Sequence, residues 1–248
     1  MLPQSPAPPE GAVLSPGAAV LAGMRASSRS VFCYTLFATF VGFGALCHDL
    51  GFSIYWATLS TALIFAGPAQ VISVTMLGAG APLLSVAFAV ALSGIRLLPM
   101  TVSLLPMLRT PQTRTRDLVL FAHFIAVSIW IETLRFAPHV PRENRISFCT
   151  GIGIGMTTSS VLGTIAGFVL AAQLPPLLSA AVLMLTPLSF LTSTARNSIL
   201  LSDRTAFVLG LTLAPLLAWM KVDFSLLIAA LTAGTLGYGA HWLRRVLQ

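Results

Sequence analysis

The sequence predicts an all-α protein whose helices cross a membrane seven or eight times and pack as one bundle. Only 8% of the 248 residues are charged and 56% are apolar, whereas a soluble globular domain carries roughly 25% charged residues. The charges gather in short clusters between long apolar runs. These runs lack the alternation of a membrane β-barrel, and an α-helix satisfies its own backbone hydrogen bonds in lipid.

Residues 1–30 differ from the rest of the chain. Prolines interrupt this stretch repeatedly and no apolar face persists, so we expect a disordered tail. No basic residue precedes its short apolar run at 18–24, whereas Arg25 and Arg29 follow that run, and a cleaved signal peptide is therefore not indicated. Residues 31–248 are expected to form a single transmembrane domain.

A membrane-spanning helix needs about 20 predominantly apolar residues. By this measure the candidate spans are 31–48, 53–77, 82–106, 118–136, 146–172, 177–194, 205–220 and 224–243. The seventh is the weakest because it is short and contains Pro215.

Basic residues beside the spans predict the orientation, because cytoplasmic loops carry an excess of Lys and Arg. With eight crossings, one side receives Arg25, Arg29, Arg135, Arg142, Arg145, Arg196, Arg204, Arg244 and Arg245. The other side receives Arg109, Arg114, Arg116 and Lys221. Both termini are therefore predicted to lie in the cytoplasm, with the protein in the inner (cytoplasmic) membrane. The cluster at 109–116 violates the rule, so either that loop is an exception or one earlier segment is re-entrant and the count is seven.

A faint internal repeat appears when the chain is shifted along itself by 119 residues. Pro68 then falls on Pro187 and Gly44 falls on Gly163. Transporters are often built from such repeats, although apolar sequence also produces matches by chance. A four-plus-four repeat with proline-broken helices and a coincidence both stay open.

The remaining composition excludes several function classes. The net charge of +7 is explained by the orientation signal and by contact with anionic lipid headgroups, so nucleic acid is not an expected partner. The cysteines, Cys33, Cys47 and Cys149, lie in or beside apolar segments without metal-ligand spacing. No catalytic constellation stands out, so neither an enzyme nor a cofactor or metal site is predicted.

The second candidate span contains Gly67 and Pro68 inside an apolar helix. Proline removes a backbone donor and clashes with the preceding turn, which frees backbone groups. Free helix ends in transporters bind substrate carboxylates and coupling ions, and Gln70 would add an amide beside the break. The alternative is a helix that is merely kinked for packing.

Arg96 lies near the middle of the third candidate span, with Pro99 three residues later. A central arginine costs roughly 2.5–3.5 kcal/mol on insertion scales, so it should face protein or a water-filled cavity. Its planar fork could hold the carboxylate of an amino acid. The alternative is a salt bridge to Glu132, and both can hold if substrate displaces the internal partner.

The fourth candidate span carries His123, Glu132 and Arg135. Glu132 and Arg135 are three residues apart on a helix, so one can simply neutralise the other. A protonatable Glu132 or His123 could instead couple transport to proton movement. The sequence leaves both interpretations open.

Small residues recur every four positions in the fifth candidate span, at Gly151, Gly155, Ser159, Gly163 and Gly167. Such a ridge lets another helix approach closely. Whether that helix belongs to this chain or to a second subunit stays open.

The stretch 42–109 resembles the AzlC family signature. It has a Gly-rich first span, the FAGPAQ element at 65–70, a small-residue turn and the Arg96-bearing third span. The later LSAAVLMLTPLSFL at 178–191 is similar to the family's second proline-bearing helix. This resemblance implies export of branched-chain amino acids by a large subunit working with a small AzlD-type membrane partner.

Two departures from the family pattern bear on the substrate. The usual Asn-Leu-Arg-His of the third span is here Gly-Ile-Arg-Leu at 94–97, and the Asp-Glu pair of the fourth span is missing, with Glu132 displaced nearby.

The sequence thus yields one main hypothesis and a rival. The main hypothesis is a secondary transporter in the lipid bilayer that exports branched-chain or similar small neutral amino acids. Its substrate pathway would be lined by Gly67, Pro68, Gln70, Arg96 and Pro187. The rival is a non-transporting scaffold or assembly subunit, and export of a different small solute is a further alternative.

Overall fold

The structure, a computed structural model, describes residues 14–95, 97–111, 113–198, 200–220 and 225–246. All regular structure in these ranges is helical, so the predicted all-α class is confirmed. The α-helices are α1 (Pro16–Ser28), α2 (Val31–Asp49), α3 (Ile54–Ile64), α4 (Gly67–Gly78), α5 (Leu83–Gly94), α6 (Leu97–Leu108), α7 (Thr115–His123), α8 (Val127–Phe136), α9 (Arg145–Gln173), α10 (Pro176–Leu183), α11 (Leu185–Asn197), α12 (Leu201–Trp219) and α13 (Ser225–Val246). Two short 3₁₀ turns, Ala137–His139 and Arg142–Asn144, join α8 to α9.

Five helical stretches in the described part of the chain are long and apolar enough to cross a membrane. They are Val31–Asp49, Leu83–Leu108, Arg142–Gln173, Leu177–Arg196 and Leu201–Trp219. Each coincides with one of the predicted spans, including the weak seventh. Helix α13 covers most of the predicted eighth span, while residues 221–224 lie outside the described residues. The count of seven or eight spans stays a prediction.

Helix α1 corrects the expectation of a disordered tail over residues 1–30. Ser15 caps this helix by accepting a hydrogen bond from the Ala18 backbone N–H, and Pro16 occupies the first helical position. Proline is favoured there because the missing N–H would have no intrahelical partner. The prediction of disorder is therefore wrong for Pro16–Ser28, and residues 1–13 lie outside the described residues.

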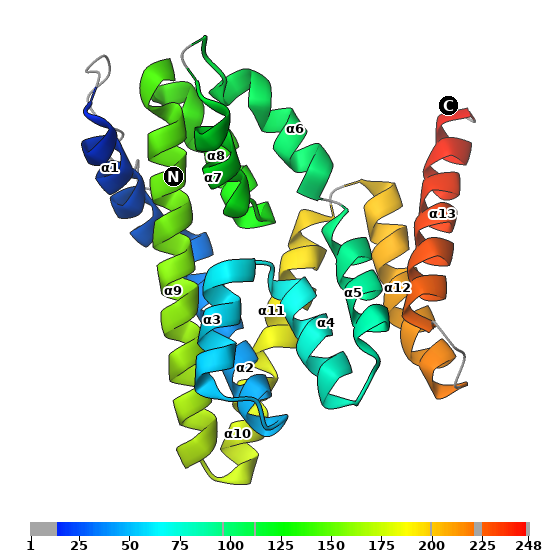
Figure 1. Cartoon of the computed structure of the whole chain (residues 1–248). Coiled ribbons are helices and arrows are strands. Elements are labelled where there is room, and N and C mark those ends of the chain that lie inside the picture. The colour runs from blue at the N-terminus through cyan, green and yellow to red at the C-terminus, as the bar shows by residue number, and fades with distance from the viewer. Residues whose placement is uncertain (1–13, 96, 112, 199, 221–224, 247–248) are drawn as a thin grey trace. The chain divides into compact units, whose positions relative to one another are not determined.

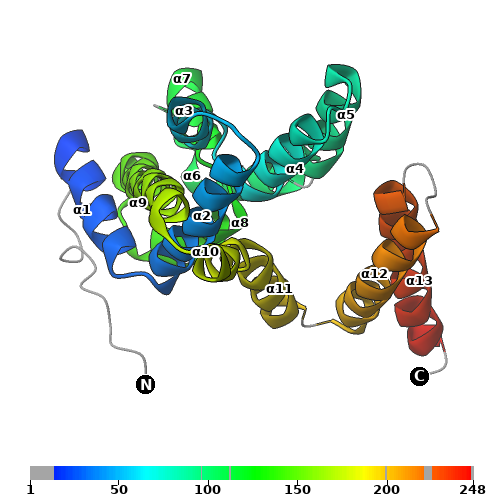
Figure 2. The same cartoon turned by 90° about the horizontal axis from the view of Figure 1, so that it is seen from below.

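Helices α1 and α2 lie along α9, one after the other (Figures 1 and 2). The predicted small-residue ridge of α9 faces them. A Cβ added at Gly151 or Gly155 would collide with α1, and one added at Gly163 or Gly167 would collide with α2. The Ser159 hydroxyl donates to the Cys33 backbone oxygen at 3.3 Å. The ridge is therefore covered by this chain itself.

The predicted second span, 53–77, is not one helix. It forms α3 and α4, and the chain reverses direction between them (Figure 1). The last residue of α4 returns to the end of α2, because a Cβ at Gly78 would lie 3.1–3.4 Å from the Leu50 side chain. The segment therefore begins and ends beside the same residue, Leu50.

The predicted fourth span, 118–136, is also two helices, α7 and α8. The segment that contains them starts after α6 and leads into α9. Arg145, the first residue of α9, donates from Nη1 to the Met107 backbone oxygen near the end of α6 at 3.0 Å. This segment too begins and ends at one place. The expectation of one continuous helix was wrong for 118–136, whereas the break predicted at Gly67 and Pro68 in the second span is present.

The helix ends agree with the proposed shift of 119 residues. Helix α3 ends at Ile64 and α10 ends at Leu183, while α4 ends at Gly78 and α11 ends at Asn197. The internal repeat gains support from this agreement but stays a prediction.

The chain divides into two compact units, Met1–Pro187 and Leu188–Gln248. In the second unit α12 and α13 pack against each other, and a Cβ at Gly237 would lie 2.7 Å from the Ser202 backbone oxygen. Helix α12 buries none of its described residues, as expected of a surface that lipid or another helix covers. One transporter domain over 31–248 stays a prediction.

Candidate functional site

The break between α3 and α4 is built around Phe65. Its φ of 36° and ψ of 44° place it in the left-handed region, which costs a residue with a side chain of order 1–3 kcal/mol. The ring is 2% exposed and stacks on Phe40, with ring centroids 6.3 Å apart. Burial of the ring holds the backbone in this conformation. Pro68 then lies in the first turn of α4, where it starts a helix instead of kinking one.

The break leaves two helix ends inside the first unit. The last backbone carbonyl groups of α3 receive no hydrogen bond within the helix, because no further helical turn follows them. One of them, the Ala62 oxygen, lies 3.3 Å from His123 Nε2 at the end of α7. At the start of α4, no side chain caps the helix. Gly67 and Pro68 are half-buried beside these ends.

Gln70 is 1% exposed and shares the deepest burial of the described predicted site residues with Glu132. Gln70 Nε2 donates to Ser60 Oγ at 3.4 Å and to Thr61 Oγ1 at 3.3 Å. Thr61 Oγ1 in turn lies 3.0 Å from Thr164 Oγ1 of α9. This polar cluster of Ser60, Thr61, Gln70 and Thr164 therefore joins α3, α4 and α9.

The Gln70 side-chain oxygen Oε1 has no hydrogen-bond partner within the described residues. A buried acceptor left without a donor costs about 1–3 kcal/mol. An amide carries two donors and an acceptor that exchange places when it rotates, so Gln70 can offer either to a ligand. A buried amide in this state is a candidate for ligand contact.

Helix α9 contributes a polar face that the sequence analysis missed. Thr150, Thr157, Ser160 and Thr164 are all buried, and their spacing places them on one side of the helix, opposite the glycine ridge. Thr157 Oγ1 also lacks a partner among the described residues. The seven-residue spacing of Thr150, Thr157 and Thr164 in an apolar helix could have predicted this polar face.

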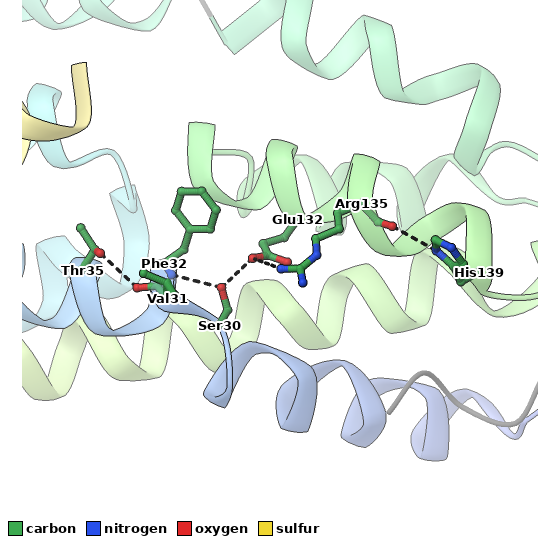
Figure 3. A network of polar contacts seen from close by, with 7 residues as sticks. All are labelled: Ser30, Val31, Phe32, Thr35, Glu132, Arg135 and His139. Carbon is green, nitrogen blue, oxygen red and sulfur yellow. Dashed lines mark hydrogen bonds and ion pairs between the residues drawn. The ribbon is translucent and has the colours of Figure 1, made fainter. Parts of the chain in front are cut away.

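Glu132 forms a second polar site (Figure 3). Its Oε1 accepts a 2.6 Å hydrogen bond from Ser30 Oγ, and Ser30 Oγ also accepts from the Phe32 backbone N–H at 3.1 Å. Ser30 thus caps α2 and binds the carboxylate at once. Arg135 Nη1 lies 3.8 Å from the same Oε1, and the arginine side chain is 51% exposed while that of Glu132 is 1% exposed.

The predicted pair of Glu132 and Arg135 is therefore present, but Ser30 is the closer partner. The second carboxylate oxygen, Oε2, has no partner among the described residues. Ser30 is separated from Glu132 by 102 positions in the chain, so the sequence offered no signal for this contact.

Of the remaining predicted residues, those that the structure describes do not belong to the polar cluster. Arg96 lies outside the described residues. Pro187 is exposed at the start of α11, and its neighbour Thr186 donates to the Thr39 backbone oxygen of α2. His123 is exposed at the end of α7. An open pocket lies elsewhere, around Leu105, Pro106, Arg109, Thr110 and Pro111.

Comparison with known proteins identifies a family. A family model described as AzlC protein matches residues 31–174, which is more than half of the chain. No curated protein and no solved structure matches. The match covers the whole of α2 to α9, and with it the α3–α4 break, the polar cluster and Glu132. The chain therefore belongs to the AzlC family.

Proposed function

We propose that this protein is a secondary transporter that exports branched-chain or similar small neutral amino acids across the cytoplasmic membrane. Membership of the AzlC family and the apolar helices support a transport-related role in a membrane. One observation carries the proposal further: a helix broken within an apolar segment places the side-chain oxygen of Gln70, which has no partner among the described residues, beside two free helix ends. A helix kept only for packing would not retain a buried acceptor without a donor.

The start of α4 suits the carboxylate of an amino acid. In the first turn of α4, Pro68 has no N–H and the Gln70 N–H donates to the Ala66 oxygen. The N–H groups of Gly67 and Ala69 remain to carry the partial positive charge of the helix start, and no side chain caps them. Arg96 stays in the proposal as a second carboxylate partner. Phe65 and Met76 are candidates for the apolar part of the pocket, and Pro187 is the counterpart of Pro68 in the matching half.

We further propose a small AzlD-type membrane subunit as partner and a location in the inner membrane with both termini in the cytoplasm. Glu132 and His123 are the candidates for proton coupling. Glu132 is favoured by its burial and by its Oε2, which has no partner among the described residues. It is also favoured by its neighbour Arg135, whose side chain is half exposed.

The rival proposal is a scaffold subunit that would use the glycine ridge of α9 to hold a partner. The covering of that ridge by α1 and α2 of the same chain supports the transporter over this rival.

Efflux from cells preloaded with leucine, isoleucine, valine or methionine tests the proposal. Cells that express this chain with its small partner should lose the amino acid faster than cells that express neither. The Gln70→Leu variant should remove the difference, while Gln173→Leu, an exposed residue at the end of α9, should retain it. Equal efflux with and without the wild-type pair would refute the proposal.

A further inference from the structure

The two split segments are each built from helices of half the length needed to cross a membrane. Helices α3, α4, α7 and α8 have 11, 12, 9 and 10 residues, which at 1.5 Å per residue gives about 14–18 Å each. The hydrocarbon core is roughly 30 Å thick. Each helix can therefore reach the middle of the membrane but not its far side.

The two segments start from opposite ends of α9. The ends of α3–α4 meet Leu50, directly after α2, and the end of α2 lies against the last turns of α9, where His48 packs on Phe168. The ends of α7–α8 lie instead at the start of α9. Met107, shortly before this segment, accepts a hydrogen bond from Arg145, which follows the segment and is the first residue of α9.

The tips of the two segments meet near the middle of α9. The tip of α7–α8 touches α9 at Gly153, where an added Cβ would lie 2.6 Å from Phe124 Cβ. Thr61, near the tip of α3–α4, contacts α9 at Thr164. The His123 ring nitrogen reaches the Ala62 oxygen, and the side chains of Phe65, Phe124 and Ile125 share one buried cluster. The middle of α9 lies between these two contact points.

We propose that α3–α4 and α7–α8 are re-entrant hairpins that enter the membrane from opposite faces, and that the C-terminal ends of α3 and α7 at their tips bind the ammonium group of the transported solute. The first half is independent of the proposed function, and the second half rests on it.

The distribution of charge supports this topology. With both hairpins re-entrant, six segments cross the membrane: 31–48, 82–106, 146–172, 177–194, 205–220 and 224–243. Of the fourteen Lys and Arg residues, Arg96 then lies inside the membrane, Lys221 lies outside the cell, and the other twelve lie in the cytoplasm. The violation at 109–116 disappears, and both termini stay cytoplasmic.

The C-terminal ends of α3 and α7 at the tips favour a positively charged group, because the C-terminal end of a helix carries partial negative charge. Helices α4 and α8 start at the same tips with partial positive charge, which suits the carboxylate instead. Unwound carbonyl groups at C-terminal helix ends bind cations in transporters. The buried Gln70 Oε1 and the hydroxyl groups of Thr61 and Thr164 supply further neutral acceptors nearby. An ammonium group needs three acceptors and can take them from this set.

Labelling of single cysteines from either face of the membrane tests the topology. The full chain is expressed with Cys33, Cys47 and Cys149 replaced by Ala, and each single cysteine is reacted with a membrane-impermeant maleimide in intact cells and in inverted vesicles. Ala79→Cys should react only from outside, and Thr115→Cys and His139→Cys only from the cytoplasm. Eight crossings would reverse the results at 79 and 115 and leave 139 in the cytoplasm.

The same three positions separate the remaining topologies. If only α3–α4 is re-entrant, position 79 is outside, 115 is inside and 139 is outside. If only α7–α8 is re-entrant, 79 is inside and the other two are outside. Asp49→Cys, which is outside in every case, is the control for access and insertion. Any pattern other than outside, inside, inside overturns the proposed topology.

The ammonium site is tested at the hairpin tip with leucine and with 4-methylpentanoate, which has the same carbon skeleton and carboxylate but no ammonium group. Leucine should protect Ala66→Cys from the maleimide in the purified chain with its small partner. The analogue should require a concentration at least roughly tenfold higher, the effect of losing a hydrogen bond to a charged group. Equal protection by both compounds would overturn the ammonium site. Absence of protection by any of the proposed amino acids would refute the proposed function and leave the topology result standing.

Discussion

Replacing Gln70 by leucine should abolish transport without destabilising the protein. The substitution removes two long hydrogen bonds, of 3.3 and 3.4 Å. Each contributes about 0.5–1.5 kcal/mol to the stability of the fold. The substitution also removes the unpartnered Oε1, which costs about 1–3 kcal/mol in the wild type. The hydroxyl groups of Ser60 and Thr61 keep partners, because both donate to the Ala57 backbone oxygen at 2.8 and 3.0 Å. At the middle of each range about 2 kcal/mol is lost and about 2 kcal/mol is gained, so the two terms cancel and the expected net change is less than about 1 kcal/mol.

The assay has two readouts on the same preparation. Apparent melting temperature in detergent should stay within about 4 °C of the wild type or rise, given about 2–4 °C per kcal/mol for a chain of this size. Amino acid efflux should fall to the level of cells without the protein. Gln173→Leu serves as the matched control, since it replaces an exposed glutamine on α9. A fall of more than about 8 °C would show that Gln70 is held for packing, and unchanged efflux would remove it from the transport site.

Three further outcomes follow from the packing and are read by the same melting assay. Gly167→Val should lower stability by about 1–3 kcal/mol or more by overpacking the ridge, whereas Gly17→Ala, whose Cβ would meet nothing within 4 Å, should be neutral or add up to about 1 kcal/mol; equal effects would contradict the close approach of α2 and α9. Phe65→Gly should destabilise by about 2 kcal/mol, because the loss of a buried ring, about 3–5 kcal/mol, exceeds the relief of about 1–3 kcal/mol of backbone strain; a more stable variant would show that the ring does not hold the break. Ser30→Ala and Glu132→Gln should show a coupling of about 1.5 kcal/mol or more in a double-mutant cycle, and additive effects would mean that the 2.6 Å hydrogen bond contributes little.

The sequence predicted those features that local residue types determine. Pro68 marked the break in the second span, and the four-residue spacing of Gly151 to Gly167 marked the packing ridge. In both cases the residue's own geometry restricts the backbone or the space beside it. These predictions needed no knowledge of which helices are neighbours.

The features that were missed depend on distant parts of the chain. The reversal at Phe65 uses a residue that rarely adopts a left-handed conformation, and it is held by the ring of Phe40. The break after α7, at Phe124–Ala126, contains neither proline nor glycine. Helix α1 was not predicted, because the prolines of this stretch, Pro16 among them, were expected to interrupt a helix. Pro16 instead occupies the first position of α1. Hydropathy gives the length of an apolar run but not the point at which the chain turns back.

The two faces of α9 differ in packing, and this difference suggests which helices move relative to one another. On the ridge face the backbones of α1 and α2 approach α9 so closely that no Cβ fits at Gly151 or Gly167, and closely packed interfaces of this kind do not slide continuously. The opposite face carries threonine and serine side chains and meets half-length helices, and the Thr157 hydroxyl on it has no partner in the part of the chain that the structure describes. Polar groups that can exchange partners allow two arrangements of similar energy. We therefore expect α1, α2 and α9 to move as one body against the hairpins, with the hydrogen bond between Ser30 and Glu132 joining the two sides.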